Sequence, residues 1–243
     1  MALLEVDGLT KSFGALSALR GVSFSIEKGE VLGLAGPNGS GKSTLFNMLT
    51  KIPTGPDAGE VRLDGQSLKR MRAHQIARAG LVRIFQTETD FGDLSVIENV
   101  LVSMPPETQP GRRAGRGVAM ALLAEFDLAD HADQPSGEIG VFNRKKLMIV
   151  TALARQPKVL LLDEPAAGLS KPEVKAMIAL IKQINAKGIA VVVIEHVISL
   201  LLALSEQLIV LNYGEVLARG NPRDVVRDPA VVEAYLGSAA DDV

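Results

Sequence analysis

A glycine-rich segment near the N-terminus has the residue types and spacing of a phosphate-binding loop. It fits the pattern G-x-x-x-x-G-K-S/T and lies between an apolar run, Val31–Leu34, and a run of helical character that begins at residue 45. Its members are Gly36, Pro37, Asn38, Gly39, Ser40, Gly41, Lys42, Ser43 and Thr44.

Glycines let backbone N–H groups turn toward a phosphate chain, and the helix that follows points its positive dipole end at the same oxygens. Lys42 adds a charge for the β- and γ-phosphates, and the Ser43 hydroxyl can bind Mg²⁺. A glycine-rich surface turn is the alternative, but the flanking strand and helix disfavour it.

Two adjacent carboxylates form the second feature with chemical potential. Asp163 and Glu164 end the apolar run Val159–Leu162. Because side chains alternate along a strand, the two carboxylates are expected to point in different directions and to have separate roles. Asp163 can bind Mg²⁺ through its water shell, and Glu164 can polarise an attacking water. The alternative for this pair alone is a strand-end turn with solvated acids.

A histidine ends a third apolar run. His196 and Glu195 follow Val191–Ile194, so His196 could contact a γ-phosphate if the strand ends meet. A lone histidine is more often structural. Only the position of His196 after a third apolar run favours a functional role for it. His74 and His131 lack such a context and are predicted to be surface residues.

The elements that must position these residues follow from the apolar patterns. Runs of strand length at Val31–Leu34, Val159–Leu162 and Ile189–Ile194 alternate with an amphipathic helix, Pro172–Asn185, which favours a mainly parallel α/β sheet. A β-hairpin is predicted around Asn212–Glu215.

The remaining segments have other characters. Glycine turns separate three short N-terminal strands, which predicts an antiparallel portion; these are Leu3–Val6, Val22–Ile26 and Val61–Leu63. From about Thr87 to Arg155 the pattern is helical, with a Pro-, Gly- and Arg-rich loop at Met104–Gly117. The tail Gly237–Val243 is small and acidic and is expected to fray.

Composition excludes several classes of protein. The 243 residues are 47% hydrophobic and 22% charged, which is ordinary for a globular chain. With 26 basic and 28 acidic residues the net charge is −2, so no global basic field indicates a nucleic-acid partner. Cysteine is absent, which excludes disulfides and thiolate zinc sites. No run reaches the roughly 18 apolar residues that a membrane-spanning helix needs.

Taken together, these motifs resemble the ATP-binding subunit of ABC transporters over nearly the whole chain. Gly36–Thr44 looks like the Walker A loop and Val159–Glu164 like Walker B. Gln86 looks like the Q-loop residue and His196 like the switch histidine. Phe13 stands where the family places an aromatic ring against adenine.

The resemblance implies a fold and a division of roles. The fold class is α/β, a RecA-like P-loop NTPase core with an antiparallel β portion and an inserted helical subdomain. Residues 1–237 would form one ATP-binding domain, with 1–86 and 156–237 as the core, 87–155 as the helical subdomain and 238–243 as a flexible tail. ATP and Mg²⁺ are the implied cofactors. Ser43, Gln86 and Asp163 would hold the metal, and Lys42, Glu164 and His196 would be catalytic.

The resemblance also implies partners. These are transmembrane permease subunits, a second ATP-binding subunit and, indirectly, a solute-binding protein, with the chain peripheral on the cytoplasmic face of the inner membrane. Three segments are similar to subunits that energise branched-chain amino-acid importers: Asp93–Val100, Asp163–Leu169 and Ala234–Gly237.

The family's signature motif, usually Leu-Ser-Gly-Gly-Gln, is degenerate here. Counting back from Asp163 places it at Ile139, Gly140, Val141, Phe142 and Asn143. The hydroxyl donor is replaced by Gly140, and a ring at Phe142 would crowd a backbone that must approach phosphate. An alternative register uses Ser136-Gly137-Glu138, four residues earlier.

Three functional hypotheses follow. The first is an ATPase that powers import of branched-chain amino acids or similar small solutes. The second is a weakly hydrolysing regulatory half of a heterodimer, suggested by the degenerate signature. The third, an ABC ATPase acting on nucleic acid, is disfavoured by the net charge, and the cluster Arg112, Arg113 and Arg116 is better explained as a solvated loop.

Overall fold

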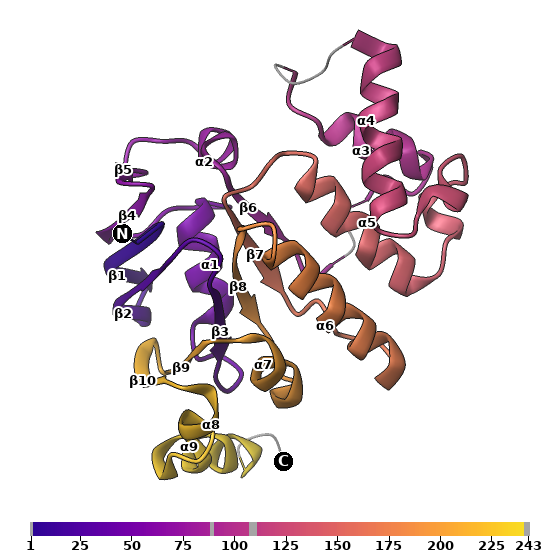
Figure 1. Ribbon diagram of the computed structural model, residues 1–243. Helices are drawn as coiled ribbons and strands as arrows, with labels where there is room; N and C mark the ends of the chain where they lie inside the picture. The colour runs from indigo at the N-terminus through magenta and orange to yellow at the C-terminus, as the bar shows by residue number, and fades with distance from the viewer. Residues whose placement is uncertain (1, 88–89, 107–110, 241–243) are drawn as a thin grey trace.

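The computed structural model describes residues 2–87, 90–106 and 111–240, which form two β-sheets and surrounding helices (Figure 1). The strands are β1 (Leu4–Phe13), β2 (Leu16–Ile26), β3 (Val31–Ala35), β4 (Ala58–Leu63), β5 (Gln66–Ser67), β6 (Leu81–Ile84), β7 (Val159–Asp163), β8 (Ala190–Ile194), β9 (Gln207–Asn212) and β10 (Glu215–Gly220). The helices are α1 (Lys42–Thr50), α2 (Ala73–Ala79), α3 (Val96–Ser103), α4 (Gly111–Glu125), α5 (Val141–Leu153), α6 (Lys171–Asn185), α7 (Ile198–Leu204), α8 (Pro222–Val225) and α9 (Pro229–Ala240).

A six-stranded sheet in the order β10-β9-β3-β8-β7-β6 forms the centre of the molecule. β9, β3, β8, β7 and β6 are parallel, and only β10 pairs antiparallel, through the predicted hairpin. Every residue of β3, β7 and β8 is buried, which explains their continuous Val and Leu runs. The α/β P-loop NTPase fold is therefore confirmed, although the sequence analysis did not identify β6.

The antiparallel portion is a four-stranded sheet in the order β2-β1-β4-β5. β1 and β2 extend well beyond the predicted cores and pair to their ends, where Phe13 lies opposite Leu16. The extensions contain polar residues, so they were not recognised from runs of apolar residues. The sheet packs over α1, and Phe46 and Leu49 of that helix are fully buried in the core between them.

Helices α3, α4 and α5 form a helical unit beside the central sheet (Figure 1). Its buried residues, such as Val100, Leu123 and Leu147, form one continuous core with Leu160 and Leu162 of β7. Helices α3, α4 and α5 are thus packed onto the sheet, and the assignment of residues 87–155 as a separate subdomain stays a prediction.

Two predicted irregular segments contain helix. Residues 111–117 belong to α4 and not to a loop, and residues 107–110 lie outside the described part. Burial of Ala119 and Leu123 in the same helix offsets the helix-weakening effect of the glycines in its first turns. At the other end of the chain, α9 runs to Ala240, so residues 237–240 are helical. Residues 241–243 of the predicted tail lie outside the described residues.

Candidate functional site

The glycine-rich loop joins β3 to α1, as the sequence predicted. Gly36 has φ +144°, and a Cβ there would lie 2.2 Å from the carbonyl oxygen of Leu211. Gly41 has φ +107° as the N-cap of α1, and a Cβ there would lie 2.7 Å from the carbonyl oxygen of Ala18. Both positions need glycine for conformation and for space. The loop therefore forms a cradle at a helix N-terminus, the arrangement that suits a phosphate.

Lys42 lies inside this cradle and is 6% exposed. Its Nζ donates hydrogen bonds to the carbonyl oxygens of Gly36 at 2.7 Å and Pro37 at 3.0 Å. Burial lowers the pKa of Lys42, while the charges of Glu164 and Asp163 act in the opposite direction. A phosphate chain in the cradle would offer the ammonium stronger, charged acceptors than these carbonyls.

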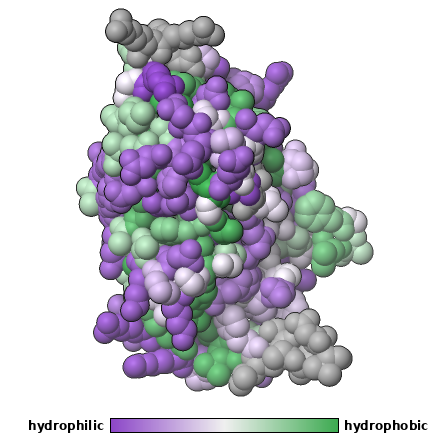
Figure 2. All heavy atoms as spheres, turned by 90° about the vertical axis from the view of Figure 1, so that its right-hand side faces the viewer, coloured by the Kyte–Doolittle hydropathy of each residue, from purple (hydrophilic) through white to green (hydrophobic). Residues whose placement is uncertain are grey.

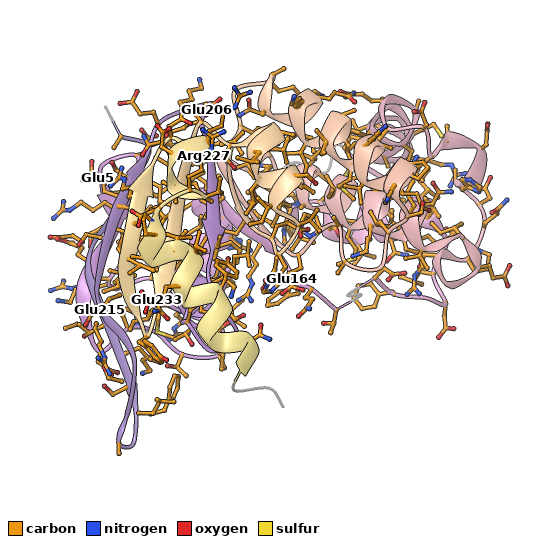
Figure 3. All side chains as sticks on the ribbon, turned by 90° about the horizontal axis from the view of Figure 1, so that it is seen from below. Glu5, Glu164, Glu206, Glu215, Arg227 and Glu233 are labelled. Carbon is orange, nitrogen blue, oxygen red and sulfur yellow. The ribbon has the colours of Figure 1, made fainter. Side chains whose placement is uncertain are left out.

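Three of the predicted catalytic and metal-binding residues lie together, with Glu164 in contact with both Gln86 and His196. Gln86 Nε2 donates to Glu164 Oε2 at 2.6 Å, and His196 Nε2 lies 3.1 Å from Glu164 Oε1. Each of the three follows a different parallel strand, β6, β7 or β8, so the sheet itself gathers them. Glu164 has φ +49°, an uncommon conformation for a non-glycine residue. Viewed from below, Glu164 lies between the central sheet and the helical unit (Figure 3).

Asp163 points elsewhere, which agrees with the alternation expected along the strand. Its Oδ2 accepts a 2.6 Å hydrogen bond from Arg83, and both side chains are 6% exposed. Arg83 also donates to Asn47 Oδ1 at 2.6 Å and stacks 4.5 Å from the centroid of the Phe85 ring. This ion pair was not expected from the sequence, although Arg83 lies only three residues before Gln86. No sequence signal connects it to Asp163, because the pairing of β6 with β7 brings them together.

Glu195 is a second residue that the sequence analysis left without a role. It is 2% exposed, and its carboxylate accepts hydrogen bonds from the N–H groups of Ala166 at 2.7 Å and His196 at 3.2 Å. Burial raises the pKa of Glu195, while these N–H donors act to lower it. Glu195 thus fixes the backbone of His196 relative to the segment that follows Glu164.

A cavity of about 340 Å³ opens over the glycine-rich loop. Phe13, residues 38–44, Glu164 and His196 line it, as expected for a nucleotide site. The predicted site residues Gly36, Pro37, Gln86 and Asp163 are not among its lining residues. Sequence reasoning missed several others, which the β1–β2 and β9–β10 hairpins supply: Leu16, Ala18, Arg20 and Tyr213. The exposed Phe13 and Tyr213 offer aromatic faces beside the loop, suited to stacking with a base.

The predicted signature segment, Ile139–Asn143, spans the start of α5. Gly140 is the N-cap and supplies no side-chain hydrogen bond. Phe142 packs against the core of the helical unit, with Lys146 Nζ 5.4 Å from its ring centroid. Asn143 Nδ2 lies 3.2 Å from His131 Nε2, so His131 is a half-buried partner of the motif and not the predicted surface residue.

Burial of Ser136 disfavours the alternative register, Ser136-Gly137-Glu138. Ser136 is fully buried, and its hydroxyl hydrogen-bonds with Asp90 Oδ2 at 2.6 Å and the carbonyl oxygen of Phe91 at 3.0 Å. This hydroxyl is therefore committed to partners inside the protein. The helix start at Val141 supports the register Ile139–Asn143.

Comparisons with known proteins agree with this geometry. Residues 19–167 match the ABC transporter family model, and residues 215–241 match the model described as "Branched-chain amino acid ATP-binding cassette transporter". The chain therefore belongs to the ABC transporter family, and it is an ATP-binding subunit that couples ATP hydrolysis to transport.

More particular similarities come from individual proteins. The chain is 36% identical, over 98% of both chains, to the high-affinity branched-chain amino acid transport ATP-binding protein BraF of Pseudomonas aeruginosa. It has the same identity and coverage to LivG of Escherichia coli strain K12, which has the same description. An ATP-binding cassette of an ABC transporter, solved in its ADP conformation, superposes with a TM-score of 0.89 at 31% identity over 98% of this chain and 99% of that one. In the part of the chain that the structure describes, no helix has the length and apolar character to span a membrane.

Proposed function

We propose that this chain binds and hydrolyses MgATP to energise an importer of branched-chain amino acids or similar small solutes. The observation that carries the hydrolytic assignment is the placement of Glu164, held between Gln86 and His196 at the mouth of the phosphate-binding loop. The transported solute is inferred from BraF and LivG, whose descriptions name branched-chain amino acid transport.

The loop residues would neutralise the phosphates. The loop leads into α1, which begins at Lys42, so N–H groups at the helix N-terminus and the Lys42 ammonium lie within the same cradle. Ser43 lines the cavity over the loop, and the hydroxyl, amide and carboxylate oxygens of the three predicted ligands are the type that a nucleotide-bound Mg²⁺ takes. Ser43, Gln86 and Asp163 would hold that ion, Asp163 through water. Bound there, the metal would supply charge neutralisation at the phosphates.

Glu164 would orient the attacking water and accept its proton. Its carboxylate is fixed by two neighbours, so little reorganisation is needed before water is activated. His196, 43% exposed at its side chain, would contact the γ-phosphate from the opposite side of Glu164. These are the roles that a loose phosphoryl-transfer transition state requires, namely positioning and charge neutralisation.

The partners proposed are transmembrane permease subunits and a second ATP-binding subunit. The helical unit and the segment that precedes α3 present exposed apolar side chains suited to such contacts; these are Val102, Val118 and Val141 in the helices and Phe91 before them. Figure 2 shows hydrophobic areas interspersed with hydrophilic ones on the side of the molecule where this unit lies. This arrangement supports a peripheral location on the cytoplasmic face of the inner membrane, with a solute-binding protein engaged only through the permease.

Nucleotide binding is tested by Lys42→Ala. We expect the affinity for MgATP to fall about 10-fold to 100-fold, because the variant loses charge-assisted hydrogen bonds to the phosphates. Isothermal titration calorimetry measures the change, with Lys175→Ala, an exposed lysine on α6, as the matched control. Equal affinities for the Lys42→Ala variant and the wild type would contradict the assignment of the loop.

The second candidate is a weakly hydrolysing half of a heterodimer. It is favoured by Gly140, which provides no hydroxyl, and by the Phe142 ring at a position that usually lacks a side chain. On this hypothesis the purified chain alone hydrolyses ATP slowly, and a catalytically complete partner raises the rate. Restoring the motif with Gly140→Ser and Phe142→Gly should then increase the ATPase rate of the chain alone. Strong activity of the unmodified chain alone would reject this candidate.

A nucleic-acid function gains no support from the basic cluster. Arg116 lies on α4 and pairs with Asp133 at 2.8 Å, so it is not part of a basic loop. The side chains of Arg112 and Arg113 lie outside the described part of the structure.

A further inference from the structure

The C-terminal helix reaches the first residue of the phosphate-binding loop. The hydroxyl of Tyr235, on α9, accepts a 2.8 Å hydrogen bond from the backbone N–H of Gly36. The two residues are 199 positions apart in the sequence. Nothing in the nucleotide-site motifs includes α9, and Tyr235 is not among the residues that line the cavity over the loop.

Gly36 is held through both of its backbone polar groups. Its N–H donates to Tyr235, and its carbonyl oxygen accepts from Lys42 Nζ at 2.7 Å. Its conformation, φ +144°, and the lack of space for a Cβ show that the step from β3 into the loop needs glycine at this point. A buried N–H without a partner is costly, so loss of the tyrosine hydroxyl would favour other conformations of this turn.

Helix α9 is packed against the central sheet close to Gly36. Figure 3 shows it lying across the face of the central sheet near β9 and β10. Val231, 4% exposed, packs into the sheet core, and an apolar pocket beneath the helix is lined by Ala35, Val210 and Tyr235 among others. Ala35 immediately precedes Gly36, so the apolar pocket and the hydrogen bond of Tyr235 both lie at the end of β3.

We propose that Tyr235 is a positioning residue for the phosphate-binding loop, which it fixes at Gly36 from the C-terminal helix. This inference rests on the proposed role of the loop in binding MgATP. When phosphates bind the ammonium of Lys42, the carbonyl of Gly36 loses its side-chain partner. The hydrogen bond that the Gly36 N–H donates to Tyr235 then still holds the loop entry. Tyr235 is not among the residues that line the cavity over the loop. It acts by keeping the loop ordered before the nucleotide binds.

The test is Tyr235→Phe, which keeps the ring and its packing and removes only the hydroxyl. Without that hydroxyl, MgATP binding must first order the loop entry, and this lowers the apparent affinity. We expect the Kd for MgATP and the KM for ATP to rise roughly fivefold, with kcat within about twofold of the wild type. Val231→Ala, on the same helix, is the matched control: it should lower the Tm by removing buried methyl groups and leave the Kd unchanged.

A second readout reports on the bond itself. In protein labelled with ¹⁵N-glycine, the amide resonance of Gly36 should shift in Tyr235→Phe and stay in place in Val231→Ala. An unchanged Kd and an unchanged Gly36 resonance in Tyr235→Phe would overturn the inference, as would an equal rise of the Kd in Val231→Ala. If the wild-type protein does not bind MgATP, the proposed function fails instead, and the Gly36 resonance still shows whether the bond exists.

Discussion

Replacement of Glu164 by glutamine should leave MgATP binding within about twofold of the wild type and lower the ATPase rate about 100-fold to 10,000-fold. The amide has nearly the shape of the carboxylate and can still contact Gln86 and His196, so the local structure should persist. It cannot accept a proton from water, however, so positioning remains and base catalysis is lost. Calorimetry for binding and phosphate release for turnover measure the two quantities on one preparation.

Glu5→Gln is the matched control for this change. Glu5 is an exposed residue of β1 that Figure 3 shows far from Glu164, and its replacement should alter neither quantity. Because the chain hydrolyses ATP, a Glu164→Gln variant that turns over at the wild-type rate would mean that another group activates the water. A variant that loses binding as well would mean that the carboxylate supports the loop and is not the base.

Replacement of Arg83 by methionine should cause the largest loss of stability. The pair that Arg83 forms with Asp163 is buried on both sides, and its removal leaves a carboxylate at 6% exposure without its cation. Breaking a buried ion pair in this way costs about 3–5 kcal/mol. For a chain of this size, the corresponding decrease in Tm is about 6–20 °C. Thermal unfolding followed by circular dichroism measures it.

Two variants separate burial from charge pairing in this result. Arg62→Met breaks an ion pair with Glu60 of similar length, 2.8 Å, but the Arg62 side chain is 46% exposed, and the cost should be about 1 kcal/mol or less. Arg83→Met combined with Asp163→Asn removes the unpaired charge and should recover part of the lost stability. Equal losses for Arg83→Met and Arg62→Met would show that the buried pair contributes no more than a surface pair.

Local sequence was sufficient for the features that depend on neighbouring residues. The loop from Gly36 to Thr44 is defined by its own spacing, and the uninterrupted apolar runs of β3, β7 and β8 fitted strands buried on both faces, which the structure confirms. The tight turn at Tyr213 and Gly214, both with positive φ, was evident from residue types. By contrast, α4 was only partly predicted, because the burial that stabilises its glycine-containing start comes from distant residues.

The sequence by itself determined the phosphate-binding loop, the strand-end acids and the α/β class, because these follow from conformational limits and periodicities that act over a few residues. Tertiary structure alone decided that Gln86 and His196 meet at Glu164, that Arg83 neutralises Asp163 and that Tyr235 reaches Gly36. Each of these contacts joins segments separated by 32 to 199 positions. Strand order and helix docking bring such segments together, and those depend on how the whole chain buries its apolar surface.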